Sequence, residues 1–308
     1  MIFILNTVLK FTWNREIGQR LKYKLKKLNF DYKKVSWSIM VYTTSENILK
    51  KNWQKMTFLS WFTLKTTIDK NVLGFADPFL IEHSNKLYLF CEAIVNQKGE
   101  IWAAQVIDDK LIAIQEALIE PFHLSFPNVF EFEGGFYMIP ESSADGTVRL
   151  YKSAEFPSKW ELHKMLYRGG RFVDTNFLHI DGILYWFTFD LDSNLSRLFY
   201  SDSLFSDWIE HPQSPFSSNR NAGDFLFEEE NILRPVQVSK NHYGEGVKLM
   251  KIVTLNQDKF EEVDYIVPFL SSLKGFSANG THHISKTKFN NKFFVAVDGK
   301  NNNFYSIV

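Results

Sequence analysis

The chain repeats itself after about residue 70, at an interval of about 49 residues. The segment 75–92 aligns without gaps on the segment 124–141, a shift of 49. The clearest matched pairs are Pro78 with Pro127, Tyr88 with Tyr137, and Glu92 with Glu141. Repetition at a fixed period of this size restricts a chain to folds assembled from similar units, such as solenoids and propellers.

Three further copies follow the first two, with decreasing similarity. They span residues 173–187, 223–237 and 282–298. A shift of 97 places Asp174 on Asp77, and the last copy places His283 on Asp77 and Asp298 on Glu92. The chain therefore contains five related units, and polar residues recur at the same place in several of them.

Each copy has the pattern of two short strands joined by a polar turn, such as Glu133-Gly134-Gly135 or Ile180-Asp181-Gly182. A third strand followed by Trp160 recurs 48 positions later as a strand followed by Trp208. Aromatic residues make up 16% of the chain and pack well on pleated sheets. Five units of about 50 residues with about four strands each predict an all-β fold, a five-bladed β-propeller. The alternative is a β-sandwich of unrelated hairpins.

The first 35 residues differ from the rest in charge. Residues 1–35 carry nine Lys and Arg and two acids, so this segment is +7 and the remainder −7. Its apolar spacing is loosely helical, so we expect a short, basic, partly helical N-terminal segment followed by a propeller domain over 36–308. The segment either contacts anionic lipid at a membrane surface or a polyanionic glycan, or is a solvated helix packed on the domain. Whether residues 1–70 cap the propeller or complete its last blade is open.

The composition excludes several classes of protein. The 35 basic and 35 acidic residues give a net charge of zero, which argues against a nucleic-acid partner. The single cysteine, Cys91, excludes a disulfide framework and any multi-cysteine metal site, and we expect it to be buried beside Glu92. No apolar run approaches the roughly 18 residues of a membrane-spanning helix, and the start lacks a cleavage signal. We therefore expect a cytoplasmic protein, with residues 1–35 as the candidate contact to the inner face of the membrane.

Repeat geometry predicts where a functional site lies. The first strand of a blade lines the central channel and the second runs back beside it, so the start of one and the end of the other are neighbours. The residues at these positions are Asp77, Glu92, Glu141, Asp174, Arg234, Gln237, His283 and Asp298. A ring of acids costs free energy unless it binds something, so we predict that this mouth of the channel is the functional face. The alternative for each residue alone is a salt bridge at a strand end.

Several segments together resemble one known family. They are Phe75–Leu80, Pro121–Pro127, Tyr137–Ser142, Phe156–Trp160, Tyr200–Leu204, Leu233–Gln237 and Tyr243-Gly244. These segments are similar to the propeller-like N-terminal domain of plant glucosamine inositolphosphorylceramide transferases and its bacterial relatives, over about residues 70–300. The resemblance implies a role in glycan assembly, and for bacterial members in the synthesis of surface polysaccharides such as capsule. The plant members carry their recognised glycosyltransferase domain in another part of the chain.

A more distant similarity suggests catalytic roles. The Asp-Pro that opens the first blade is similar to that of invertase, levansucrase and arabinanase enzymes. In those enzymes a first-blade aspartate is the nucleophile or base, which implies that role for Asp77. A later-blade glutamate is the general acid, and Glu141 is the best candidate, although it lies in the second blade. Asp174, at the position of Asp77 in the third blade, is the third catalytic candidate.

Glycosyl transfer passes through a cationic, oxocarbenium-like state that nearby carboxylates stabilise. A nucleotide-activated donor also needs cations for its phosphates, and the candidates are Arg220, Arg234, His282 and His283. The remaining candidates for substrate binding are Glu92, His123, Ser125, Asp224 and Gln237. The nucleotide-binding loops and the histidine and cysteine spacings of metal sites are missing, so we predict neither a metal nor a cofactor.

These observations favour a glycosyltransferase that moves a sugar from a nucleotide-activated donor to a glycan acceptor. A glycoside hydrolase of the same fold is the enzymatic alternative. A glycan-binding propeller that positions a partner transferase is the non-enzymatic one.

Overall fold

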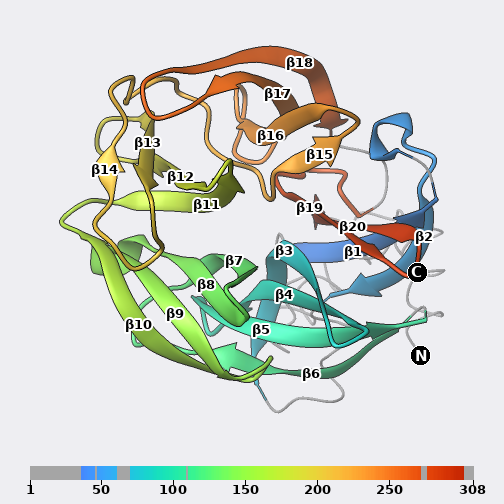
Figure 1. Cartoon of the computed structure of the whole chain (residues 1–308). Coiled ribbons are helices and arrows are strands. Elements are labelled where there is room, and N and C mark those ends of the chain that lie inside the picture. The colour runs from blue at the N-terminus through green and yellow to red at the C-terminus, as the bar shows by residue number, and fades with distance from the viewer. Residues whose placement is uncertain (1–35, 46, 61–69, 109, 272–275, 302–308) are drawn as a thin grey trace, which may run out of the picture.

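The structure is a computed structural model that describes residues 36–45, 47–60, 70–108, 110–271 and 276–301. It contains five four-stranded antiparallel sheets arranged in a ring (Figure 1). The helical elements among these residues are two 3-10 turns, η1 (Ile48–Lys50) and η2 (Ser143–Asp145). The predicted all-β, five-bladed propeller is therefore confirmed.

The first four blades each use four consecutive strands. Blade 1 consists of β3 (Val72–His83), β4 (Lys86–Val95), β5 (Lys98–Ile107) and β6 (Lys110–Leu118). Blade 2 consists of β7 (Ser125–Phe132), β8 (Gly135–Ser142), β9 (Thr147–Glu155) and β10 (Lys159–Arg168). Blade 3 consists of β11 (Phe172–Ile180), β12 (Ile183–Asp190), β13 (Leu195–Ser201) and β14 (Ile209–Glu210). Blade 4 consists of β15 (Leu226–Glu228), β16 (Asn231–Val238), β17 (Gly246–Leu255) and β18 (Phe260–Ser271).

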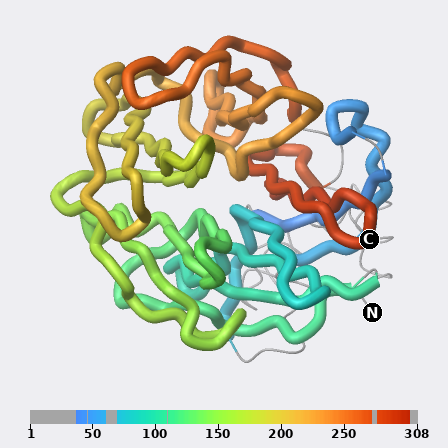
Figure 2. The backbone as a smooth tube through the Cα atoms, viewed as in Figure 1, coloured from blue at the N-terminus to red at the C-terminus, as the bar shows by residue number. Residues whose placement is uncertain are grey.

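The fifth blade joins the two ends of the described chain. Its strands are β19 (Ile284–Phe289), β20 (Lys292–Asn301), β1 (Ser36–Thr44) and β2 (Gln54–Leu59), in that order across the sheet. β1 pairs antiparallel with β20 from Ser36 opposite Asn301 to Thr44 opposite Phe293. The blue and red ends of the tube consequently lie side by side in Figure 2. Residues 36–59 thus complete the last blade, which decides between the two placements left open by the sequence.

The basic segment 1–35 lies outside the described residues, so its helical character and its membrane contact remain predictions. Within the ranges that the structure describes, no helix has the length and apolar character needed to cross a membrane.

Local sequence explains the hairpins. In blades 2 and 3 the two inner strands are joined by Glu133-Gly134 and Asp181-Gly182, and all four residues have positive φ. Two-residue turns of this kind match the twist of the flanking strands. The repeated Trp160 and Trp208 both pack into clusters between blades.

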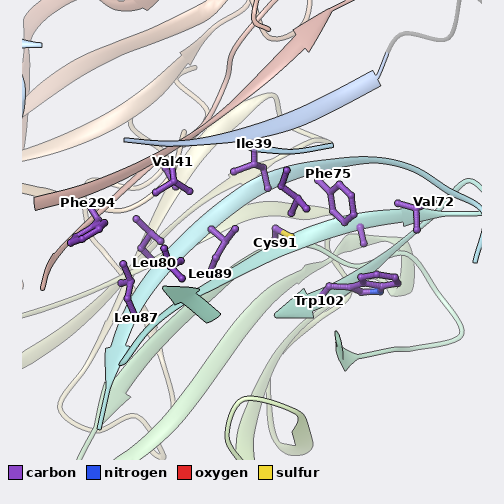
Figure 3. Packing of buried hydrophobic residues seen from close by; sticks show 14 of the residues in the cluster. Ile39, Val41, Val72, Phe75, Leu80, Leu87, Leu89, Cys91, Trp102 and Phe294 are labelled. Atoms are coloured by element: carbon purple, nitrogen blue, oxygen red, sulfur yellow. The ribbon is translucent and has the colours of Figure 1, made fainter. Parts of the chain in front are cut away.

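The core consists of five hydrophobic clusters, one between each pair of neighbouring blades. Figure 3 shows the cluster between blades 5 and 1, where Ile39 and Val41 of β1 face Leu89 and Cys91 of β4. Cys91 is buried there as predicted, and burial raises the pKa of its thiol. Burying each of these aliphatic side chains contributes about 1.5–3 kcal/mol, so the closing strand is held by packing as well as by backbone pairing.

A bulge recurs near the start of the innermost strand in blades 1 to 3. The pairing with the second strand shifts register after Ala76, Ser125 and Val173. The next residue has positive φ each time, 51° at Asp77, 44° at Phe126 and 51° at Asp174. A bulge re-aims the side chain that it carries, and left-handed backbone at a residue other than glycine concentrates at functional positions. The repeat thus directs two aspartates away from the regular alternation of the strand.

Candidate functional site

The innermost strands β3, β7, β11, β15 and β19 surround the centre of the ring (Figure 1). Asp77, Glu141 and Asp174 lie at the same end of these blades and are close enough to influence one another. After burial, the negative charge of Asp174 is the largest influence that raises the pKa of Glu141, and Asp77 adds to it. The structure therefore brings the three catalytic candidates into one electrostatic unit.

Asp77 lies against two histidines from the last blade. Its Oδ1 is 3.1 Å from His282 Nε2 and 3.6 Å from His283 Nδ1, and its Oδ2 accepts the Phe126 N–H at 3.0 Å. Asp298 completes the group, because its Oδ2 lies 2.7 Å from His282 Nδ1. Burial raises the pKa of Asp77, but the contacts with His282 and His283 outweigh burial and lower it below the usual aspartate range. Asp77 is therefore an ionised carboxylate at neutral pH.

The pKa of Glu141 is shifted in the opposite direction to that of Asp77. Burial and the charge of Asp174 raise its pKa to about 7, although the Arg220 guanidinium and the Ser143 hydroxyl lower it. Arg220 Nη2 lies 3.6 Å from Glu141 Oε2, and Ser143 Oγ donates to Glu141 Oε1 at 2.9 Å. The Glu141 side chain is 12% exposed, so it reaches solvent. A carboxyl group with this pKa can donate a proton at neutral pH.

Asp174 is held rigidly between these groups. Arg220 forms a two-pronged ion pair with it, and Gln237 Nε2 donates to Asp174 Oδ2 at 3.0 Å. Asn221 Nδ2 donates to the Asp174 backbone carbonyl at 2.7 Å. Gln237 was predicted to bind substrate, and the structure instead shows it orienting Asp174. Asp174 in turn fixes Arg220 beside Glu141.

Glu92 and His123 form a second pair near Asp77. His123 Nε2 lies 3.1 Å from Glu92 Oε1, while its Nδ1 accepts the Gly99 N–H at 2.9 Å. The proton of the neutral imidazole is therefore on the nitrogen that faces Glu92. Gly99 permits this approach, because a Cβ there would lie 2.2 Å from the Leu124 carbonyl oxygen. His123 is 40% exposed and forms the rim of the site.

Asp224 is partly buried and belongs to a polar group shared by several blades. Its Oδ2 accepts Ser285 Oγ at 2.5 Å, and Asn128 Nδ2 lies 3.5 Å from its Oδ1. Asn176 Nδ2 donates to the Gly223 backbone carbonyl at 2.6 Å, which ties blade 3 to blade 4. Burial raises the pKa of Asp224 to about 7. These contacts join innermost strands across blades.

Arg234, a candidate contact for donor phosphates, is paired with an acid inside its blade, which is the salt-bridge alternative left open for each residue at the mouth. Its side chain is fully buried, and Nε donates to Glu262 Oε2 at 2.8 Å while Nη2 donates to Glu262 Oε1 at 2.5 Å. Nη1 donates to Asn221 Oδ1 at 2.7 Å. The guanidinium therefore packs within the blade, because every one of its prongs already has an acceptor. Sequence position alone placed it at the mouth.

His283 and Ser125 are also enclosed. His283 has no exposed surface, packs edge-on against Phe79 and Phe126, and its ring nitrogens make no hydrogen bond among the described residues. Ser125 is buried, and its backbone pairs with Glu141. Both lie behind the charged groups rather than at the surface.

Two aromatic residues at the rim were absent from the predicted site. Tyr243 is 45% exposed, although its ring lies 5.6 Å from the Arg220 guanidinium and 5.2 Å from the His282 ring. Trp37 of β1 packs on His282 at 4.3 Å. The sequence held one signal for Tyr243, since Tyr243-Gly244 belongs to the set of segments that resembles the family. Trp37 had none, because its position depends on ring closure.

Asp77, His282 and Asp298 are buried, and their ligand-type atoms lie within 4.8 Å of one another. They are the group in the described ranges with the geometry to hold a metal ion. His282, however, directs Nε2 toward Asp77 and Nδ1 toward Asp298. The imidazole thus occupies the space between the two carboxylates, and its positive charge offsets one of their two negative charges.

The fold and this end of the ring define a five-bladed propeller with a cluster of buried carboxylates. Residues 62–300 match the family described as glucosamine inositolphosphorylceramide transferase 1, N-terminal, and the chain belongs to this family. Its relatives include glucosamine inositolphosphorylceramide transferase 1 from Oryza sativa subsp. japonica, 32% identical over 243 residues, and from Arabidopsis thaliana, 32% identical over 245. The matches cover 72% and 73% of this chain and 32% of each relative, so the chain spans about a third of their length.

Several solved structures with the same fold are described as glycoside hydrolases. The α-L-arabinofuranosidase PaAbf62A from Podospora anserina superposes with a TM-score of 0.56 at 12% identity, covering 75% of this chain and 92% of that one. A family-43 β-1,3-galactosidase gives a TM-score of 0.54 at 10% identity, covering 74% and 86%. At these identities the likeness shows the fold alone.

Proposed function

We propose that this propeller catalyses glycosyl transfer at the carboxylate cluster. The observation that carries the proposal is the separation of pKa values between Asp77 and Glu141, one lowered and the other raised to about 7. Two carboxyl groups whose environments push their pKa values apart are suited to act as one anion and one acid. The names of the family relatives support the same class of reaction.

In the proposed reaction, Glu141 donates its proton to the oxygen of the leaving group. The ionised Asp77 carboxylate stabilises the positive charge that develops at the anomeric carbon. The acceptor hydroxyl then attacks that carbon and gives its proton to the Glu141 carboxylate, which restores the acid. Arg220, which is 25% exposed, holds Asp174 and sets the pKa of Glu141.

A nucleotide-activated donor remains our proposal for the source of the sugar, with Arg220 as the phosphate contact, and surface-polysaccharide assembly remains the proposed setting. Hydrolysis of a glycoside is the second candidate, and one observation favours it. A phosphate leaving group needs no proton, whereas a glycosidic oxygen does, and Glu141 has the pKa of a proton donor.

The test is a screen of the full chain against nucleotide sugars and aryl glycosides, with a small alcohol as acceptor and products identified by mass spectrometry. Asp77→Asn should lower turnover by about 10²–10⁴-fold, the usual contribution of such a group. Glu141→Gln should lose most activity with poor leaving groups and little with dinitrophenolate. Glu228→Gln is the matched control, since Glu228 is a buried carboxylate paired with Lys286 away from the cluster.

Transfer to the alcohol would support a transferase, and release of free sugar alone would support the hydrolase. Full activity in Asp77→Asn would overturn the proposed roles. Oligosaccharide binding without turnover of any substrate would support a non-catalytic propeller.

A further inference from the structure

Three buried side chains lie in a row from the last blade to the first. Asp298 of β20 contacts Nδ1 of His282 at 2.7 Å, and Nε2 of the same ring contacts Asp77 of β3 at 3.1 Å. All three are at most 5% exposed. The imidazole is therefore the link between two carboxylates that come from opposite ends of the sequence.

Both carboxylates are anchored to backbone. Asp298 Oδ1 accepts the N–H groups of His282 and His283 at 2.8 and 3.1 Å, and Asp77 Oδ2 accepts the Phe126 N–H at 3.0 Å. Each acid keeps its other oxygen for His282. The ring itself is fixed from the side by Trp37, at 4.3 Å. The row is thus rigid at each of its three members.

The charges in this row depend on one another. Two buried carboxylates are costly to remove from water without a cation between them. Burial lowers the pKa of His282, but Asp298 and Asp77 outweigh burial and raise it to about 10. The other charged or titratable groups around the ring are Glu92 of β4, the neighbouring His283, Tyr243, and Lys300 of β20, whose Nζ lies over the Trp37 ring at 5.5 Å. The ion-pair contacts with His282 come from Asp298 and Asp77.

We propose that Asp298 and His282 are positioning residues for Asp77, with Asp298 holding the His282 imidazolium and the imidazolium holding the Asp77 carboxylate. The sequence assigned His282 to donor phosphates, and it placed Asp298 at the mouth of the channel without a catalytic or binding role. In this arrangement His282 faces two acids and does not serve a phosphate. The inference rests on the proposed function only for the role of Asp77, whereas the contact itself can be tested without a substrate.

The row also depends on closure of the propeller by β1. Asp298 lies on β20, the strand that pairs with β1, and Trp37 of β1 packs on the His282 ring. The environment of Asp77 is therefore completed only when the N-terminal strand has joined the last blade.

The first experiment is NMR titration of the full chain labelled with ¹⁵N-histidine, which reports the protonation of its eight imidazoles. One imidazole should remain doubly protonated above pH 8, and its signal should disappear in His282→Gln. In Asp298→Asn its midpoint should fall by at least one unit, because the amide keeps the backbone contact but loses the charge. Glu228→Gln, which removes the charge of a buried carboxylate elsewhere in the ring, should leave it unchanged.

A His282 signal that titrates near pH 6.5, or that does not respond to Asp298→Asn, would overturn the proposal. So would one equivalent of bound metal in the purified protein that is lost in His282→Gln.

The second readout is the pH dependence of kcat/KM. His282→Gln should move the acidic limb upward by about one unit, since Asp77 loses the positive charge that lowers its pKa, and Glu228→Gln should not. An unmoved acidic limb in an active His282→Gln enzyme would overturn the positioning role. If the wild-type chain turns over no substrate, the proposed function fails, and the histidine titration still decides whether the row exists.

Discussion

Asp77 and Glu141 occupy neighbouring blades at the same end of the ring, yet their surroundings differ in kind. Asp77 is enclosed by histidines from the last blade, which lower its pKa, whereas Glu141 shares one arginine with a second acid, which leaves its pKa at about 7. Asp77 is 5% exposed, and the side chain of Glu141 is 12% exposed. One repeated scaffold therefore produces an anion and an acid through the partners that each blade receives from its neighbours.

The largest expected consequence of the difference between Asp77 and Glu141 is on the free energy of unfolding. The folded pKa of Glu141, about 7, exceeds its ordinary value of 4.5, so the folded state binds the proton more tightly than the unfolded state. Stability therefore falls as pH rises from about 4.5 to 7, and the cost is fully present above pH 7. Glu141→Gln should raise the free energy of unfolding by about 1–3 kcal/mol at pH 8 and by much less at pH 5. Urea unfolding at the two pH values measures it.

Glu228→Gln provides the contrast, because Glu228 makes an ion pair with Lys286 and its loss should destabilise the fold at pH 8. A Glu141→Gln variant that is less stable than wild type at pH 8 would contradict the raised pKa.

A second substitution should widen the difference in pKa between Glu141 and Asp77. Arg220 lowers the pKa of Glu141 and pairs with Asp174, so Arg220→Met should raise that pKa. The basic limb of the pH–rate profile should then shift upward by about one unit. Arg171→Met is the control, since Arg171 forms an exposed ion pair with Asp192 in the same blade. A basic limb that moves downward or stays in place would show that Glu141 is not the acid whose ionisation limits the rate.

The smallest expected effect concerns substrate binding at the rim between the two acids. Tyr243 exposes an aromatic ring beside Arg220 and His282, and such rings stack on sugars. Tyr243→Ala should raise KM by about threefold to tenfold and change kcat by less than about twofold. Tyr265→Ala, which removes a ring of similar exposure on β18, should change neither constant. Equal effects of the two variants would show that Tyr243 has no specific role.

The same contrast appears in how well the site was predicted. The repeat placed Asp77, Glu141 and Asp174 at one end, and the structure brings them together. Arg220 and Arg234 were equivalent candidates for binding phosphate. In the structure Arg220 forms ion pairs with Asp174 and Glu141, whereas Arg234 forms an ion pair with Glu262. Nothing local distinguishes these two arginines, because the acids that they pair with lie 28 or more positions away.

By itself the sequence determined the five blades, their hairpins and the tryptophans between them, because turn chemistry and strand alternation are local and recur with the repeat. Tertiary structure alone decided that residues 36–59 complete the last blade, and that Asp298 and Trp37 surround His282. The charge state of a buried group depends on the distances to groups from other blades. Those distances exist only once the ring is closed.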